Sequence, residues 1–229
     1  EKPFDYSLVN VENLKECFLY FPELKSYLAV NQTLYRMPLF PAVWEGNQSM
    51  VVKTLKLGDL VTASAEKRKL PISSPEKSYH NHDVSVKFNP DMDTAHIVMI
   101  NHFAGHNAAE IMPILVFLEN EKREDAVKEI IRISEKDEKI ENLQYENNDY
   151  RSMQQQKPLK ISSVMHTTNN IEKAGNKYLF KIGELIGRQA EMYQEKPRKF
   201  DLEIPNPHQY TRSIQVEIPK GYKVSNLDK

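Results

Sequence analysis

The sequence predicts a mainly β protein of the α+β class, with an antiparallel β-sandwich-like body and a two-helix insertion. Apolar and polar residues alternate in short segments from residue 80 onward, as in residues 84–88, and this period of two is typical of antiparallel strands with one exposed face. Turn-forming residues such as Asn89-Pro90-Asp91 separate these segments. One stretch with helical spacing of apolar residues, near 106–134, interrupts the strands.

A short β segment is expected before this body, over residues 1–65. Strands are predicted at residues 17–21 and 50–57, and a proline-rich bend joins them. Residues 66–79 are predicted to form a linker, because they contain the basic run Lys67-Arg68-Lys69 and two prolines. The run lacks the interleaved aromatic residues of a nucleic-acid site, so it is expected to be solvated.

The main body is predicted to span residues 80–229. Its strands are predicted at residues 84–88, 97–100, 143–145, 159–164, 178–182, 200–204 and 214–218. The last two are each followed by a proline, which cannot donate a hydrogen bond to a β-ladder and therefore ends the strand. Gly221 is expected to adopt a positive φ in the turn that follows, where a Val would be costly.

Two helices are predicted near residues 106–119 and 121–134. Asn107 and Glu110 have the spacing of a capping box, in which the Asn side chain accepts from the Glu backbone and the carboxylate reaches back. Pro113 is expected to kink or restart the first helix, because proline removes a backbone donor.

Composition argues against several classes of function. The 229 residues include 31 Lys and Arg and 32 Asp and Glu, a formal net charge of −1. The chain therefore has no overall positive charge that would attract nucleic acid or an anionic membrane. No apolar run approaches the roughly 20 residues of a membrane-spanning helix. The seven glycines form neither a dinucleotide fingerprint, nor a phosphate-binding loop, nor a serine-hydrolase elbow, so no cofactor is predicted.

Cys17 is the single cysteine, which excludes an internal disulfide and a multi-cysteine zinc site. Because it precedes an apolar run in a predicted strand, it is expected to be a buried, unreactive thiol. The chain begins with Glu1 rather than Met, so we expect either that a signal peptide was removed or that the sequence is a piece of a longer protein.

Five residues could form a metal site. His102, His106 and Glu110 recur every four residues, and on a single helix they would share one face. His80 and His82 alternate, so both rings would point to one side of a strand. These residues define the enzymatic alternative, a metal-dependent hydrolase. We favour ordinary structural roles, since His102 is expected on a strand end, His106 in a turn and Glu110 in the cap.

Aromatic residues crowd the N-terminal part of the chain. Trp44 and Tyr35 could form a stacking platform for a glycan, which defines a second alternative, a glycan-binding module. Packing of both rings in a corner of the core is the simpler interpretation.

Several segments resemble a family of large bacterial envelope proteins, common in Bacteroidetes, that carry a transglutaminase-like domain flanked by β-rich domains of unknown function. The resembling segments are Tyr20-Phe21-Pro22-Glu23-Leu24, Lys173-Ala174-Gly175-Asn176-Lys177-Tyr178, Ile186-Gly187-Arg188-Gln189-Ala190-Glu191 and Ile218-Pro219-Lys220-Gly221-Tyr222. They follow the order of the region after the transglutaminase core, and the last is the most characteristic.

This resemblance implies that residues 8–31 correspond to the last strands of a papain-like unit that uses Cys, His and Asp. The chain departs from that pattern. The first histidine is His80, the position expected for the Asp holds no acid although Asn31 lies there, and Cys17 does not match the nucleophile. We therefore expect no catalytic residue. The predicted function is a non-catalytic accessory domain, periplasmic or at the cell surface, that binds or scaffolds a protein or glycan partner.

Overall fold

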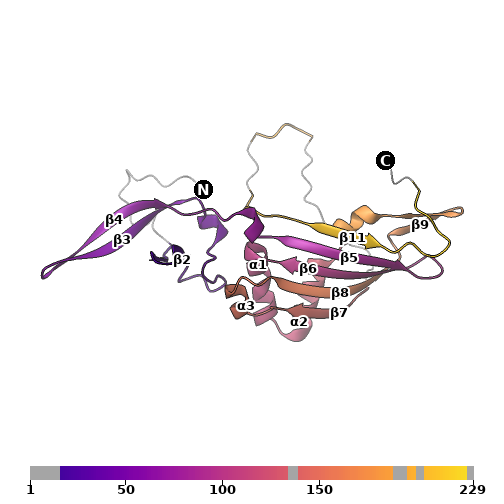
Figure 1. The fold of residues 1–229 in the computed structure, drawn as a ribbon, viewed down its shortest axis with the longest axis horizontal. Helices are drawn as coiled ribbons and strands as arrows, with labels where there is room; N and C mark the ends of the chain where they lie inside the picture. The colour runs from indigo at the N-terminus through magenta and orange to yellow at the C-terminus, as the bar shows by residue number, and fades with distance from the viewer. Residues whose placement is uncertain (1–15, 134–138, 188–194, 200–203, 226–229) are drawn as a thin grey trace.

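The computed structural model describes residues 16–133, 139–187, 195–199 and 204–225, and the account below refers to these residues. The body contains one large sheet with helices packed on it (Figure 1). The N-terminal part lies at one end of this sheet, and a long hairpin projects from it.

The large sheet has five strands in the order β11-β5-β6-β8-β7. Their bounds are β5 His80–Phe88, β6 Ala95–Phe103, β7 Lys139–Glu146, β8 Leu159–Thr167 and β11 Arg212–Val216. Neighbours from β5 to β7 pair in antiparallel fashion, as the alternating pattern predicts. β11 instead pairs parallel to β5, with Arg212 opposite His82 and Val216 opposite Val86.

The period-two pattern places one set of side chains in the core. On β6, Ile97, Met99 and Phe103 are buried, whereas the alternate residues Val98 and Ile100 are partly exposed on the other face. We call that second face, formed by the alternate residues of all five strands, the open face. Among the described residues no helix covers it.

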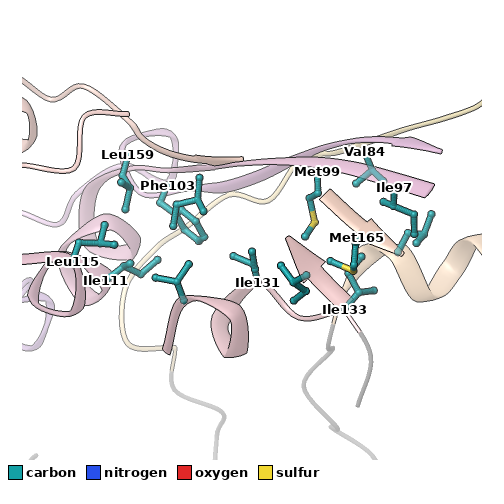
Figure 2. Close-up of a cluster of buried hydrophobic side chains, with 14 of the residues drawn as sticks. Val84, Ile97, Met99, Phe103, Ile111, Leu115, Ile131, Ile133, Leu159 and Met165 are labelled. Carbon is teal, nitrogen blue, oxygen red and sulfur yellow. The ribbon is translucent and has the colours of Figure 1, made fainter. Parts of the chain in front are cut away.

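Helices cover the core face. α1 (Gly105–Phe117) and α2 (Asn120–Ile131) follow β6, and the short α3 (Tyr150–Gln154) precedes β8. Figure 2 shows Ile111 and Leu115 of α1 and Ile131 of α2 on the side to which Phe103 and Met99 point. This burial of aliphatic side chains between sheet and helices supplies most of the hydrophobic stabilisation of the body.

The predicted capping box is wrong. α1 begins at Gly105, two residues earlier than Asn107, and its N-cap is Ala104. In the first turn of α1, the backbone N–H of His106 finds its hydrogen-bond acceptor outside the helix, in the Ser78 hydroxyl at 3.1 Å. Pro113 lies inside α1, which continues through it to Phe117.

The N-terminal part has a small core of its own. β1 (Leu19–Phe21) and β2 (Ser26–Leu28) form a hairpin, followed by the 3-10 turn Ala42–Trp44. Tyr27, Ala29, Phe40 and Leu70 are buried there. β3 (Gln48–Leu57) then pairs with β4 (Leu60–Lys69), so residues 66–69 belong to a strand and not to the predicted linker. These residues form a strand because they pair with residues 48–51 of β3, and the local sequence of 66–69 does not show that partner.

Residues 171–186 also pack against the core side of the large sheet. The hairpin of β9 (Ile171–Ala174) and β10 (Lys177–Phe180) turns at Gly175, and the 3-10 turn Ile182–Ile186 buries Leu185 completely. The strand predicted at residues 200–204 falls mostly outside the described residues. Gly221 has a φ of +91°, as expected for its turn.

The mainly β, α+β fold class with a two-helix insertion is therefore confirmed. The layer opposite the large sheet consists mainly of the two predicted helices. In the described part of the chain, no helix has the length and apolar character needed to cross a membrane.

Candidate functional site

A polar cluster of buried and partly buried side chains lies at the end of the sheet nearest the N-terminal part. It consists of His80 and His82 on β5, Asn101 on β6 and Arg212 on β11. The Nε2 atom of His80 lies 3.0 Å from Asn101 Oδ1 and 2.5 Å from His82 Nε2. Phe103 stacks on the His80 ring, with 4.0 Å between ring centroids. The prediction that both His rings share one side of a strand is confirmed.

The environment keeps both imidazoles neutral. Burial lowers the pKa of His80 to about 4, and burial, His80 and the Arg212 guanidinium lower the pKa of His82 to about 3. Arg212 is itself held in place, because its Nη1 donates to the backbone carbonyl of His80 at 2.5 Å.

This cluster is a hydrogen-bonding link between strands rather than a built metal site. Two nitrogen ligands of a tetrahedral zinc ion, each at about 2.0–2.1 Å, are more than 3 Å apart, whereas the His80 and His82 nitrogens are 2.5 Å apart. Arg212 also places a positive charge beside them. One Nε2–H of His80, donated toward Asn101 Oδ1 and shared with His82 Nε2, accounts for the geometry.

The His102, His106 and Glu110 cluster predicted from spacing is not assembled. His102 lies on the open face and pairs with Asp83 at 3.2 Å, His106 is buried at the start of α1, and Glu110 is exposed. The spacing puts them on one helix only if the helix begins before His102, and β6 occupies those residues instead. No three His, Cys, Asp or Glu side chains come together as a metal site within the described ranges.

His106 instead joins the N-terminal part to the body. Its Nε2 lies 3.0 Å from Glu45 Oε1, and both side chains are almost fully buried. Ser73 donates to the same carboxylate through its backbone N–H at 3.0 Å and its hydroxyl at 2.5 Å. Sequence reasoning missed Glu45 and Ser73, because 61 residues separate Glu45 from His106.

The predicted aromatic platform is divided between two places. Trp44 packs near Phe18 in the small N-terminal core, with 6.5 Å between ring centroids. Tyr35 lies edge-on to His106, at 6.2 Å, and burial together with the carboxylate of Glu110 raises the pKa of its hydroxyl. Both rings are half-buried, and the expected packing in a corner of the core holds for Trp44 but not for Tyr35, which lies against His106 instead.

One further prediction from sequence, that of a buried Cys17 thiol, can be compared with the structure. Cys17 is exposed, so the expectation of a buried thiol is wrong, because β1 begins two residues later at Leu19. His96 and His166, which have no partner in sequence, lie opposite each other on β6 and β8.

The β3–β4 hairpin, residues 48–69, exposes an unusual number of large apolar side chains, and we call it the arm. Its strands pair at all ten positions from Gln48–Lys69 to Leu57–Leu60, and the hairpin extends away from the body (Figure 1). Six large apolar side chains of the arm are 42–65% exposed: Met50, Val52, Leu55, Leu57, Leu60 and Val61.

Comparison of the chain with protein-family models, with curated proteins and with solved structures finds no match.

Proposed function

We propose that this chain is a non-catalytic interaction domain that binds a protein partner through the arm. The observation that carries this proposal is the set of exposed aliphatic side chains on the two faces of the arm, with Met50, Val52 and Val61 on one face and Leu55, Leu57 and Leu60 on the other. Within the described part of the chain, nothing packs over most of its length. The buried His80–His82–Asn101 cluster has the bonding pattern of a structural link, so catalysis is not part of the proposal.

The energetics of an isolated hairpin support this. A two-stranded ribbon is marginally stable in water by itself, and stable sheets have at least a third strand or a packed face. At about 25 cal/mol per Å², burial in an interface of the side chains on one face, Met50, Val52 and Val61, would contribute several kcal/mol. Exposed apolar patches on soluble proteins usually mark interaction surfaces, and each face of the arm carries three large exposed apolar side chains.

The base of the arm is anchored, which gives the arm a defined direction. Val51 and Ser49 are buried at the base, and the Ser49 hydroxyl donates to the carbonyl of Arg68 at 2.7 Å. The Arg68 guanidinium lies over the ring of Tyr20 at 4.3 Å. The buried Glu45–His106 pair then holds the N-terminal part against the body. An anchored arm loses less entropy on binding than a mobile one.

A protein partner is favoured over a glycan. Glycan sites commonly use exposed aromatic faces, and the arm contains no aromatic residue. The resemblance to the β-rich regions of transglutaminase-like envelope proteins supports a location in the periplasm or at the cell surface, as an accessory domain of a larger protein.

Site-specific photo-crosslinking in the producing cells tests this function. A photoreactive amino acid replaces Val61 on the arm, and in a matched control it replaces Leu179 on β10, which is 56% exposed. We expect a discrete protein adduct from position 61 and none from position 179. The absence of an adduct at position 61, or equal adducts at both positions, would contradict the proposal.

A further inference from the structure

A pair of histidines on the open face lies apart from both the arm and the polar cluster around His80. His96 on β6 and His166 on β8 are directly opposite each other in the antiparallel pairing of these two neighbouring strands of the large sheet (Figure 1). Both side chains are partly exposed, and their ring centroids are 4.8 Å apart with an angle of 58° between the ring planes. The two rings are therefore neighbours that solvent reaches, and they do not stack in parallel planes.

We propose that His96 and His166 together bind one divalent transition-metal ion, with Cu²⁺ bound most tightly. Neutral imidazole is a common ligand of Cu²⁺, Ni²⁺ and Zn²⁺, and Cu²⁺ has the highest affinity of the three for a given set of nitrogen ligands. The site does not involve the arm, so it adds a binding activity to the proposed interaction function without depending on it.

The distance between the two rings fits two ligands of a single ion. An ion in the plane of an imidazole, about 2.0–2.1 Å from its nitrogen, lies about 3.2 Å from the ring centre. At bond angles of about 90–110°, two such rings have their centres about 4.5–5.2 Å apart. The observed 4.8 Å lies within this range. Directly opposed residues on antiparallel strands keep their Cβ atoms about 4.5–5.5 Å apart, so β6 and β8 hold the pair at this separation.

The ring nitrogens of this pair are available to a ligand. Within the described part of the chain, no hydrogen bond engages the nitrogens of His96 or His166. In the polar cluster, by contrast, the Nε2 atoms of His80 and His82 are 2.5 Å apart, and His80 also contacts Asn101. The pair on the open face therefore has free nitrogens at the right separation, and the pair in the polar cluster does not.

The charged side chains beside the pair balance one another. Each histidine has a lysine opposite it on the next strand outward, and each lysine is ion-paired with a glutamate. The two ion pairs are Lys87 with Glu217, beside His96, and Lys139 with Glu141, beside His166. The four charges sum to zero, so the surroundings of the histidines place no net positive charge against an incoming cation.

Two protein ligands leave the remaining positions of the ion to water or to another molecule. Among the described residues, no third His, Cys, Asp or Glu side chain completes a group of three with the pair. We therefore expect an affinity in the micromolar range, below that of a closed structural site with four protein ligands. Hard cations such as Mg²⁺, which prefer oxygen ligands, should not bind.

Isothermal titration calorimetry with CuCl₂ tests the proposal, on the chain without an affinity tag and after removal of bound metal by EDTA. We expect one Cu²⁺ per chain, weaker binding of Zn²⁺ and no binding of Mg²⁺. His96→Gln and His166→Gln should each raise the Kd for Cu²⁺ at least about tenfold. His102→Gln, which changes another partly exposed histidine on the same face of β6, is the matched control and should leave the Kd unchanged.

Electron paramagnetic resonance of the Cu²⁺-loaded wild type gives a second readout that does not depend on how any variant folds. We expect coupling of the ion to two imidazole nitrogens, and coupling to one or none would overturn the proposal. A wild-type chain without saturable Cu²⁺ binding would also overturn it. So would a Kd that is unchanged in His96→Gln, or that rises as much in His102→Gln as in His96→Gln.

Discussion

Acidification is expected to destabilise this protein through His80 and His82. Both pKa values in the folded chain lie below the ordinary value of 6.5, at about 4 and about 3. The unfolded chain therefore takes up protons first as the pH falls. The contribution of the two neutral rings is complete above about pH 6.5, and it is lost progressively between pH 6.5 and the folded-state values.

The magnitude follows from the size of the two shifts. One pKa unit corresponds to about 1.4 kcal/mol, and pH 5 lies 1.5 units below the ordinary value and above both folded-state values. Each ring then loses about 2 kcal/mol, and the pair loses about 4 kcal/mol between pH 8 and pH 5. This is a large fraction of the total stability of a typical domain.

Urea unfolding at a series of pH values, followed by circular dichroism, measures this loss. His82→Gln should be less stable than the wild type at pH 7, because a buried hydrogen-bond partner is removed. Its stability should also fall less steeply, by about half, between pH 7 and pH 5. His96→Gln, on the open face, is the matched control and should retain the wild-type slope. Equal slopes for His82→Gln and the wild type, or a His82 ring that titrates near pH 6.5 by NMR, would refute the reasoning.

Three further predictions concern single side chains. Gly105→Ala should lower the free energy of unfolding, measured by urea titration, by about 3 kcal/mol or more. The reason is that φ is +57° and the new Cβ would lie 2.3 Å from the Lys77 carbonyl oxygen. Gly175→Ala is the matched control and should cost only about 1–2 kcal/mol, because φ is +64° but no atom lies within 4 Å of the new Cβ. Glu45→Ala should cost about 3–5 kcal/mol, since it leaves the buried His106 and the partly buried Ser73 without their acceptor. Thermal unfolding should show a clearly smaller loss for Glu45→Gln. Gly221→Val should lower the melting temperature, but less than Gly105→Ala, because φ is +91° in open space; an unchanged melting temperature would contradict this.

Local pattern predicted the elements well where one face of each is buried by neighbours. The alternation around Val84 and Val164 marks β5 and β8, and the helical spacing around Ile111 marks α1. Helix boundaries were less predictable. The start of α1 depends on the fit of Gly105 against Lys77 and on the Ser78 hydroxyl, and both lie outside the local pattern that suggested Asn107 as a cap.

In the candidate sites too, local pattern predicted the placement of single residues but not their partners from other strands. The alternation of His80 and His82 correctly predicts that both rings share a side, but Asn101 and Arg212 reach them from other strands. The spacing of His102, His106 and Glu110 suggests one helical face, and the end of β6 separates them. Only pairing between distant segments decides which side chains meet.

The sequence by itself determined the class of fold, because hydrophobic periodicity is a local property that each strand or helix carries alone. It also determined the absence of the common phosphate-binding and serine-hydrolase motifs. The tertiary structure alone decided that β11 pairs parallel to β5, that Glu45 meets His106, and that the arm stands away from the body. The physical reason is that alternation specifies a face to be buried but not what buries it, so Val52 and Val84 look alike in sequence and differ only in their surroundings.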